Sequence, residues 1–261
     1  MLKAITTAAT GLEAQQANIE RISADLANVN TDSYKKSSTE FQDLMYETIK
    51  EPGAQLGAGS QSPVGIQRGL GVKVGATHKQ FEQGPARMTY NQFDMMIEGQ
   101  GFFPIQLPDG QVGFSRHGAF HVDSKGILQQ ANGAKLIPQI IIPRSATSIV
   151  VSPQGEVKAT MPNEGDIVIG QIQLVSFQNP EGLSAGGFGS YQPTQASGPP
   201  IQGMPGDSGL GHISQGALEG SNVNVANSMV DMISSQRAYE MNAKVMSTAN
   251  EMLGATINVI K

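Results

Sequence analysis

Residues 5–29, ITTAATGLEAQQANIERISADLANV, decide the architecture that the sequence predicts. One set of residues recurs every seven positions, and a second set follows three positions after the first. The two sets are Ile5, Leu12, Ile19 and Leu26, then Ala8, Gln15, Ile22 and Val29. Such a repeat is typical of a helix that packs lengthwise against another helix. An amphipathic helix that covers the core of its own domain has a similar pattern, so both interpretations stay open here.

The C-terminal stretch, residues 225–260, has a matching repeat. One column is Met232, Tyr239, Met246, Leu253 and Ile260, and its companion column is Met229, Gln236, Ala243, Asn250 and Ile257. A second apolar stripe beside them is formed by Val230, Ile233, Met241, Val245, Met252 and Val259. A helix with two apolar stripes has more than one neighbour. We therefore expect the two ends of the chain to pair with each other and the second stripe to meet other copies of the chain.

Polar residues within these repeats leave two alternatives. Gln15, Gln236 and Asn250 occupy predicted contact positions, where single buried polar residues fix the register of paired helices. They face solvent instead if the contact lies one residue away. Ser221, Asn222 and Asn224 are candidate N-caps of the second helix.

Composition excludes several classes of protein. Lys and Arg number 17 against 22 Asp and Glu, and the resulting charge of −5 argues against a nucleic-acid binder. The chain has no Cys, which excludes disulfides, zinc ribbons and cysteine nucleophiles. No apolar run approaches the roughly 18 residues of a membrane span. Threonines at positions 6, 7 and 10 interrupt the N-terminus, so we expect no cleavable signal peptide.

Glycine and proline separate the middle of the chain from its ends. Residues 1–51 and 221–261 contain one Gly each and no Pro, although the chain has 31 Gly and 14 Pro. Two helix-permissive ends therefore flank a turn-rich centre. We predict an α+β fold, with long N- and C-terminal helices that pair as a coiled-coil-like bundle and a central, mainly antiparallel β domain.

Short apolar runs around turn residues predict the strands of that domain, over about 72–180. Residues 105–107 and 112–114 flank Pro-Asp-Gly, and 120–122 and 127–128 flank a turn with Gly126, so each pair predicts a hairpin. Further strands are expected at 140–142, 149–151 and 172–175, with a turn at 152–155. Two Gly- and Pro-rich stretches, 52–75 and 179–212, are expected to be irregular.

The search for catalytic chemistry finds little. His117 and His121 have the spacing of two metal ligands on a helix, but their surroundings predict strand and turn, so no metal site and no cofactor are expected. Gly99 and Gly101 lack the rest of a dinucleotide fingerprint and are interpreted as tight turns. The alternative to a binding or structural protein is a periplasmic cell-wall-processing enzyme with a carboxylate pair in the β domain. Its candidate residues are Asp94, Glu98 and Asp123.

Three stretches resemble the signatures of the bacterial flagellar rod, hook and hook-associated proteins. Residues 22–36, ISADLANVNTDSYKK, resemble the N-terminal signature of that family. Residues 97–120, which contain IEGQGFF, LPDG and FSRHGAF, resemble its central β motif. Residues 218–225, LEGSNVNV, and 236–242, QRAYEMN, resemble its C-terminal signature. The order of the motifs and their spread over the chain identify it as a member of this family, and residues 41–55 are most similar to the distal rod type.

The resemblance implies a structural subunit and no enzyme. It implies self-assembly into a hollow helical shaft, the distal rod, which transmits motor torque to the hook and lets exported subunits pass. The implied partners are further copies, other rod proteins, the hook protein, the surrounding basal-body rings and the rod cap, with no nucleic acid and no direct membrane insertion. The implied location is the periplasmic part of the flagellar basal body, reached through the flagellar type III system without cleavage.

The same resemblance divides the chain into four segments. Residues 1–35 and 216–261 are the helices of an inner tube, 72–215 form the central β domain with the loop 179–212, and 36–71 are an extended insertion that contacts neighbouring subunits. The expected assembly residues of the helices are Ile5, Leu12, Ile19, Ile22, Leu26, Val29, Met229, Met232, Tyr239, Met246, Leu253, Ile257 and Ile260. Those of the insertion are Phe41, Leu44, Met45, Tyr46 and Ile49. We expect the insertion to stiffen the shaft through lateral contacts.

Overall fold

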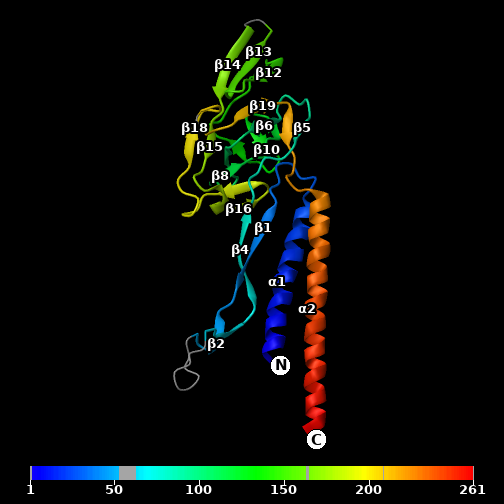
Figure 1. The fold of residues 1–261 in the computed structure, drawn as a ribbon. Coiled ribbons are helices and arrows are strands. Elements are labelled where there is room, and N and C mark those ends of the chain that lie inside the picture. Colours follow the sequence, from blue (N-terminus) through cyan, green and yellow to red (C-terminus); the bar gives the residue numbers. More distant parts are fainter. Residues whose placement is uncertain (1, 53–62, 163–164, 208, 261) are drawn as a thin grey trace. The chain divides into compact units, whose positions relative to one another are not determined.

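The structure of the chain is a computed structural model that describes residues 2–52, 63–162, 165–207 and 209–260, the side chains of 257–260 excepted. Two compact units make up the chain. The terminal unit comprises residues 1–27, 37–78 and 224–261, and the central unit comprises residues 28–36 and 79–223. The fold is α+β, with a helix at each end of the sequence and a mostly antiparallel β region between them (Figure 1). No described helix is both long enough and apolar enough to span a membrane.

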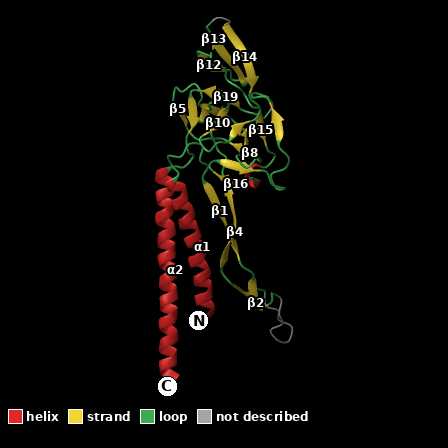
Figure 2. Cartoon of the chain, turned by 180° about the vertical axis from the view of Figure 1, so that it is seen from behind, coloured by secondary structure: helices red, strands yellow, loops and turns green. Residues whose placement is uncertain are grey.

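Two helices dominate the terminal unit. They are α1 (Leu2–Ala27) and α2 (Val225–Ile260), and they lie side by side in opposite directions (Figures 1 and 2). Helix α1 ends well before residue 35, because residues 28–33 are rich in Asn, Thr, Asp and Ser, which favour turns. Val29, expected on the helix, lies in the turn that follows. Asn224 is the N-cap of α2, since its side-chain oxygen accepts the backbone N–H of Asn227 at 3.2 Å.

Small and polar side chains line the contact between α1 and α2. The amide nitrogen of Asn18 donates to the Ser235 hydroxyl at 2.8 Å. A Cβ added to Gly11 would meet the Asn242 amide at 3.0 Å, so the glycine allows close approach of the helices. The buried residues of this unit include Ala8, Ala14, Ile22, Ser235 and Ala249.

For Gln236 and Asn250 the second alternative applies, because the contact of α2 with α1 lies one residue before them. Met229, Gln236 and Asn250 are exposed. The residue just before each of them is less exposed: Ser228 is half-buried, and Ser235 and Ala249 are buried. The other predicted column is partly buried at Met232, Met246 and Leu253. The apolar periodicity misled the prediction because the helix contact uses small residues, while larger apolar residues lie next to it.

The terminal unit also contains a two-stranded ribbon. Its strands are β1 (Ser37–Asp43), β2 (Tyr46–Lys50), β3 (Ile66–Gly69) and β4 (Val72–Lys79). Strand β1 pairs with β4, and β2 pairs antiparallel with β3. The expected insertion, 36–71, thus contains β1, β2 and β3, whereas β4 begins at residue 72 and lies outside it. Of the irregular stretch predicted at 52–75, residues 66–69 and 72–75 are in strands, and 53–62 lie outside the described residues.

The central unit is built from short strands. In chain order they are β5 (Ala86–Met88), β6 (Met95–Glu98), β7 (Phe103–Gln106), β8 (Val112–Ser115), β9 (Phe120–Val122), β10 (Leu128–Gln130), β11 (Lys135–Leu136), β12 (Ser148–Val151), β13 (Glu156–Met161), β14 (Gly165–Gln171), β15 (Leu174–Ser176), β16 (Ser184–Gly187), β17 (Ser190–Gln192), β18 (Ile201–Gly203), β19 (His212–Gln215) and β20 (Ala217–Glu219). A 3-10 turn spans Pro180–Gly182. One sheet has seven strands in the order β16-β17-β8-β7-β11-β10-β9, and another has three, β12-β13-β14.

Both predicted hairpins are confirmed. Strands β7 and β8 pair antiparallel across Pro-Asp-Gly, and β9 pairs with β10 across a turn in which Gly126 has a φ of +83°. The strand predicted at 140–142 is wrong: the only pairing there within the described residues is a single bridge from Ile141 to Ile127. Ile140 and Ile142 are nevertheless buried in the core, which explains the apolar run.

The prediction of an irregular stretch at 179–212 is also wrong. It contains β16 and β17, which extend the seven-stranded sheet beside β8, and β18, which pairs with β15. Its glycines act as turn residues between short strands, since Gly187, Gly189 and Gly198 all have positive φ. A high glycine content therefore marked closely spaced turns.

Candidate functional site

The three signature stretches meet at a buried ion cluster in the central unit. Glu219, at the end of β20, accepts the Lys35 ammonium at 2.6 Å and the Arg116 guanidinium at 2.9 Å. All three side chains are almost fully buried. Glu219 also accepts the backbone N–H of Gly84 at 2.9 Å. One carboxylate thus joins the N-terminal, central and C-terminal signatures.

Neighbouring residues complete the hydrogen bonds of this cluster. Arg116 donates to the carbonyls of Gly99 and Gly101, both of which have positive φ. The Lys35 ammonium donates to the Glu82 carbonyl at 2.6 Å. Because buried charges are stable only with partners, this network holds residues 28–36 in the central unit.

Asn222 makes a second connection at the same place. Its side-chain oxygen accepts the Lys36 N–H at 2.7 Å, and its amide nitrogen donates to the carbonyls of Gln80 and Glu82. Its own backbone N–H donates to the Tyr34 carbonyl. Asn222, proposed from the sequence as a helix cap, instead ties three segments together.

The cluster contains two cations and one anion, and this charge balance shifts the pKa values of Glu219 and Lys35. Burial opposes ionisation of Glu219, but Arg116 and then Lys35 overcome it and hold the pKa of Glu219 below its usual value. Burial lowers the pKa of Lys35, and the Glu219 carboxylate compensates only in part because the like charge of Arg116 lowers this pKa further. Glu219 is thus the member of the cluster whose charged form is favoured by its surroundings.

The residues considered for catalysis have other surroundings. Asp94 is buried and accepts hydrogen bonds from Thr89 and Asn91, so it stabilises a turn. Glu98 is exposed at the end of β6, and Asp123 lies at the hairpin turn between β9 and β10. His121 is on β9 and His117 lies before it, outside any helix. Within the described ranges, no group of three or more His, Cys, Asp or Glu residues has the arrangement of a metal site.

The predicted assembly residues of the helices occupy two kinds of environment. On α1, Ile22 is buried, and Ile5, Leu12, Ile19 and Leu26 are half-buried. On α2, Met229 and Tyr239 are exposed, and Met232, Met246 and Leu253 are half-buried. The side chains of Ile257 and Ile260 lie outside the described residues. The second apolar stripe of α2 is exposed at Val230, Ile233, Met241, Val245 and Met252.

The ribbon also exposes large apolar side chains. Met45 is 84% exposed, and Phe41, Tyr46 and Ile49 are exposed to lesser extents. Leu44 is half-buried, and its N–H donates to the Gly71 carbonyl. Isolated two-stranded ribbons are marginally stable in water. Burial of these exposed side chains against a partner would therefore stabilise the ribbon.

Comparison with known proteins assigns the family. The model described as flagellar basal body rod FlgEFG protein C-terminal matches residues 214–259, and the flagellar hook protein FlgE/F/G D1 domain model matches residues 96–159. The chain is similar to the flagellar basal-body rod protein FlgG of Borreliella burgdorferi, with 42% identity over 99% of both chains. It is 41% identical to that of Caulobacter vibrioides over 98% of both chains, and 31% identical to that of Bacillus subtilis over 99% of both.

Proposed function

The chain belongs to the FlgG family of flagellar basal-body rod proteins, and from this premise we propose that its copies polymerise into a hollow helical shaft, the distal rod. It is a structural subunit of the flagellar rod and not an enzyme. The shaft would transmit motor torque to the hook and let exported subunits pass through its centre. The carboxylates considered for a wall-processing enzyme lie in a turn, at a strand end and in a hairpin, which gives that alternative no support.

The observation that carries the proposal is the exposed apolar stripe of α2. The contact between α1 and α2 uses small residues, so it leaves Val230, Ile233 and Met241 exposed. Exposed apolar patches of this kind mark protein interfaces. We propose that these side chains pack between helices of neighbouring copies as a coiled-coil-like bundle. The assembly residues predicted for the two helices would take part in the same contacts.

The proposed arrangement assigns a role to each segment. Residues 1–35 and 216–261 form the inner tube, and 72–215 form the outer β layer. A contact between two different surfaces of identical molecules grows into a filament when it does not close into a ring. The proposed partners beyond further copies are other rod proteins, the hook protein, the basal-body rings and the rod cap. The proposed location is the periplasmic part of the basal body, after export by the flagellar type III system.

The ribbon is proposed to stiffen the shaft. Its exposed Phe41, Met45, Tyr46 and Ile49, with the half-buried Leu44, would lie against neighbouring subunits and add lateral contacts. In Met45→Ser/Tyr46→Ser, filaments would still form but bend more easily, as measured by their persistence length in electron micrographs. Gln42→Ser, an exposed polar change in β1, is the control. Equal stiffness in both variants would refute the stiffening role.

The proposal of self-assembly is tested by two neighbouring substitutions on α2. Ile233→Asp places a charge in the exposed apolar stripe, and Ser234→Asp places it at an exposed polar position beside it. We expect Ile233→Asp to raise the critical concentration for filament growth at least roughly tenfold, because an interface anchor contributes more than 1 kcal/mol. Sedimentation and electron microscopy measure the effect. Equal polymerisation of both variants would count against the stripe as an assembly surface.

A further inference from the structure

The outward face of α2 carries two bases among its exposed apolar side chains. Arg237 and Lys244 are exposed, and no other described residue forms a salt bridge with either of them. Each lies two positions after a residue of the contact with α1, Ser235 or Asn242, which places it about 200° around the helix from that contact. Because seven residues separate the two bases, they lie on one face, about 10 Å apart along the helix.

The outward face of α1 carries two acids with the same spacing. Glu13 and Glu20 are exposed, and among the described residues neither forms a salt bridge. They lie two positions after Gly11 and Asn18, the α1 residues of the same contact, so they lie on the side of the helix opposite to α2 of their own chain. Leu2 is the only large apolar side chain that α1 exposes within its described residues. The rest of this face is therefore acidic and formed by small and polar side chains.

The two outward faces complement each other in charge and in size. The large side chains of Val230, Ile233 and Met241 on α2 pack most closely against small side chains, which the face of α1 offers. Both acids can pair with both bases at once, because the spacing is seven residues on each helix. Two α2 helices in register would instead bring like charges together, which opposes association. Charge and size therefore favour α1 of another copy as the partner of α2.

We propose that the outward face of α2 in one copy packs on the outward face of α1 in the next copy. Within one chain the two helices run in opposite directions (Figures 1 and 2). With the helices along a shaft whose copies share one direction, α1 of the next copy is antiparallel to α2 as well. Arg237 then lies beside Glu20 of that copy. Lys244 lies beside Glu13. The inference rests on the proposed self-assembly and identifies one of its contacts.

This pairing displaces each copy along the helix axis. Within one chain Asn18 lies opposite Ser235. With Glu20 opposite Arg237, Asn18 of the next copy lies opposite Tyr239, four residues further along α2. At 1.5 Å per residue, the displacement is about 6 Å. A contact between two different faces with such a displacement does not close into a flat ring and continues as a helix.

Charge reversal on α2 tests the contact. Arg237→Glu sets an acid against the acidic face of the next copy, so the critical concentration for polymerisation should rise at least roughly tenfold. Gln236→Glu adds a negative charge at the neighbouring exposed position, outside the face, and is the control. We expect this control to polymerise like the wild type in sedimentation. Polymerisation of Arg237→Glu at the wild-type concentration would overturn this inference and leave self-assembly standing.

A compensating reversal on α1 tests which residues pair. Arg237→Glu/Glu20→Arg restores opposite charges across the contact, so its critical concentration should return to within about threefold of the wild type. Arg237→Glu/Glu13→Arg should stay impaired, because Glu20 still faces the new acid. Rescue by Glu13→Arg in place of Glu20→Arg, or by neither, would overturn the pairing. If the unsubstituted chain itself does not polymerise, this inference and the proposed self-assembly both fail.

Discussion

In the central unit five phenylalanine side chains and the Lys35, Arg116 and Glu219 cluster are buried, whereas in the terminal unit large apolar side chains of α2 and the ribbon are exposed. Phe81, Phe102, Phe114, Phe177 and Tyr191 pack edge to face around one cluster of the central unit. The terminal unit has no comparable aromatic cluster among its described residues. The difference supports the proposal that the terminal unit gains much of its burial on assembly, while the central unit carries its own stability.

Glu219→Gln should break the central side of this comparison. It leaves the Lys35 and Arg116 charges buried without their carboxylate, and removal of one partner of such a cluster costs about 3–5 kcal/mol. Denaturant unfolding of the full chain, followed by the near-ultraviolet signal of the tyrosines, measures the loss. Glu98→Gln removes an exposed carboxylate and is the matched control. A loss below 1 kcal/mol would contradict the role of the cluster.

Ile22→Asp should affect the terminal unit alone. Ile22 is 1% exposed, and its burial contributes about 1.5–3 kcal/mol, to which the substitution adds a charge without a partner. We expect loss of assembly with an unchanged central unit. Leu26→Asp should block assembly for the same reason, with a smaller loss of helix packing because Leu26 is only half-buried. Filaments built by both variants at the wild-type concentration would show that the α1 contact is assigned wrongly.

Limited trypsin digestion should distinguish the units within one chain. At low concentration we expect cleavage after the exposed Lys3 and Arg68 at least about tenfold faster than after the buried Lys35 and Arg116, since about 1.4 kcal/mol of extra local stability suffices for this. Mass spectrometry of timed samples gives the order of cuts. Assembly should slow cleavage after Lys3 and leave Arg116 unchanged. Equal rates at all four sites in dilute solution would remove the contrast between the units.

Local signals in the sequence predicted some elements well. The hairpins at 103–115 and 120–130 were predictable because turn residues and alternation lie within a few positions of each other. The end helices were predictable from periodicity. The contact face of α2 was not, because Ser235 and Ala249 carry little apolar signal, although they allow close packing.

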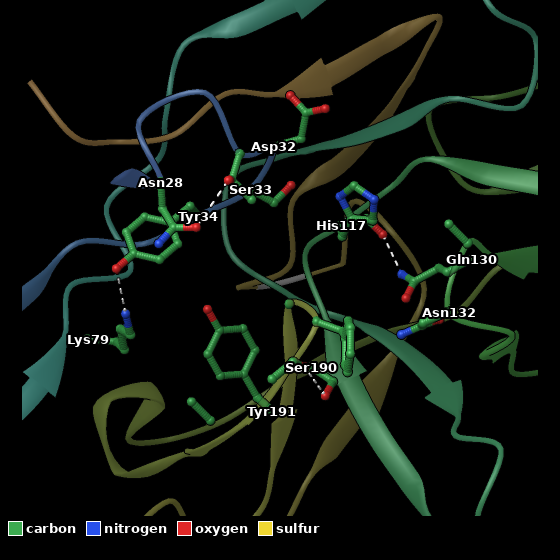
Figure 3. A pocket seen from close by; sticks show the side chains of 16 residues that line it. Asn28, Asp32, Ser33, Tyr34, Lys79, His117, Gln130, Asn132, Ser190 and Tyr191 are labelled. Carbon is green, nitrogen blue, oxygen red and sulfur yellow. Dashed lines mark hydrogen bonds between the residues drawn. The ribbon is translucent and has the colours of Figure 1, made fainter. Parts of the chain in front are cut away.

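Long-range partners could not be predicted in the same way. Lys35, Arg116 and Glu219 are widely separated in sequence, and neither spacing nor composition indicates that they meet. Only the family signatures singled out these stretches. A pocket lined by Asn28, Tyr34, His117 and Tyr191 (Figure 3) was missed for the same reason, since its walls come from segments far apart along the chain.

Acidification should give the smallest of these effects. It should destabilise the central unit through protonation of His117. Burial lowers the pKa of His117, and the nearby Asp32 carboxylate offsets this only in part. A lowered pKa means that the folded state binds the proton less readily than the unfolded state. Stability from this group is therefore complete above the ordinary histidine value of about 6.5 and is lost as the pH falls below it.

The slope of unfolding free energy against pH between about 7 and 5 measures this contribution, which is at most about 1.4 kcal/mol per pH unit for one group. His117→Gln should make the slope shallower. His121→Gln changes an exposed histidine on β9 and is the control. If His121→Gln changes the slope and His117→Gln does not, the acid sensitivity comes from the surface, and the interior of the central unit is not its source.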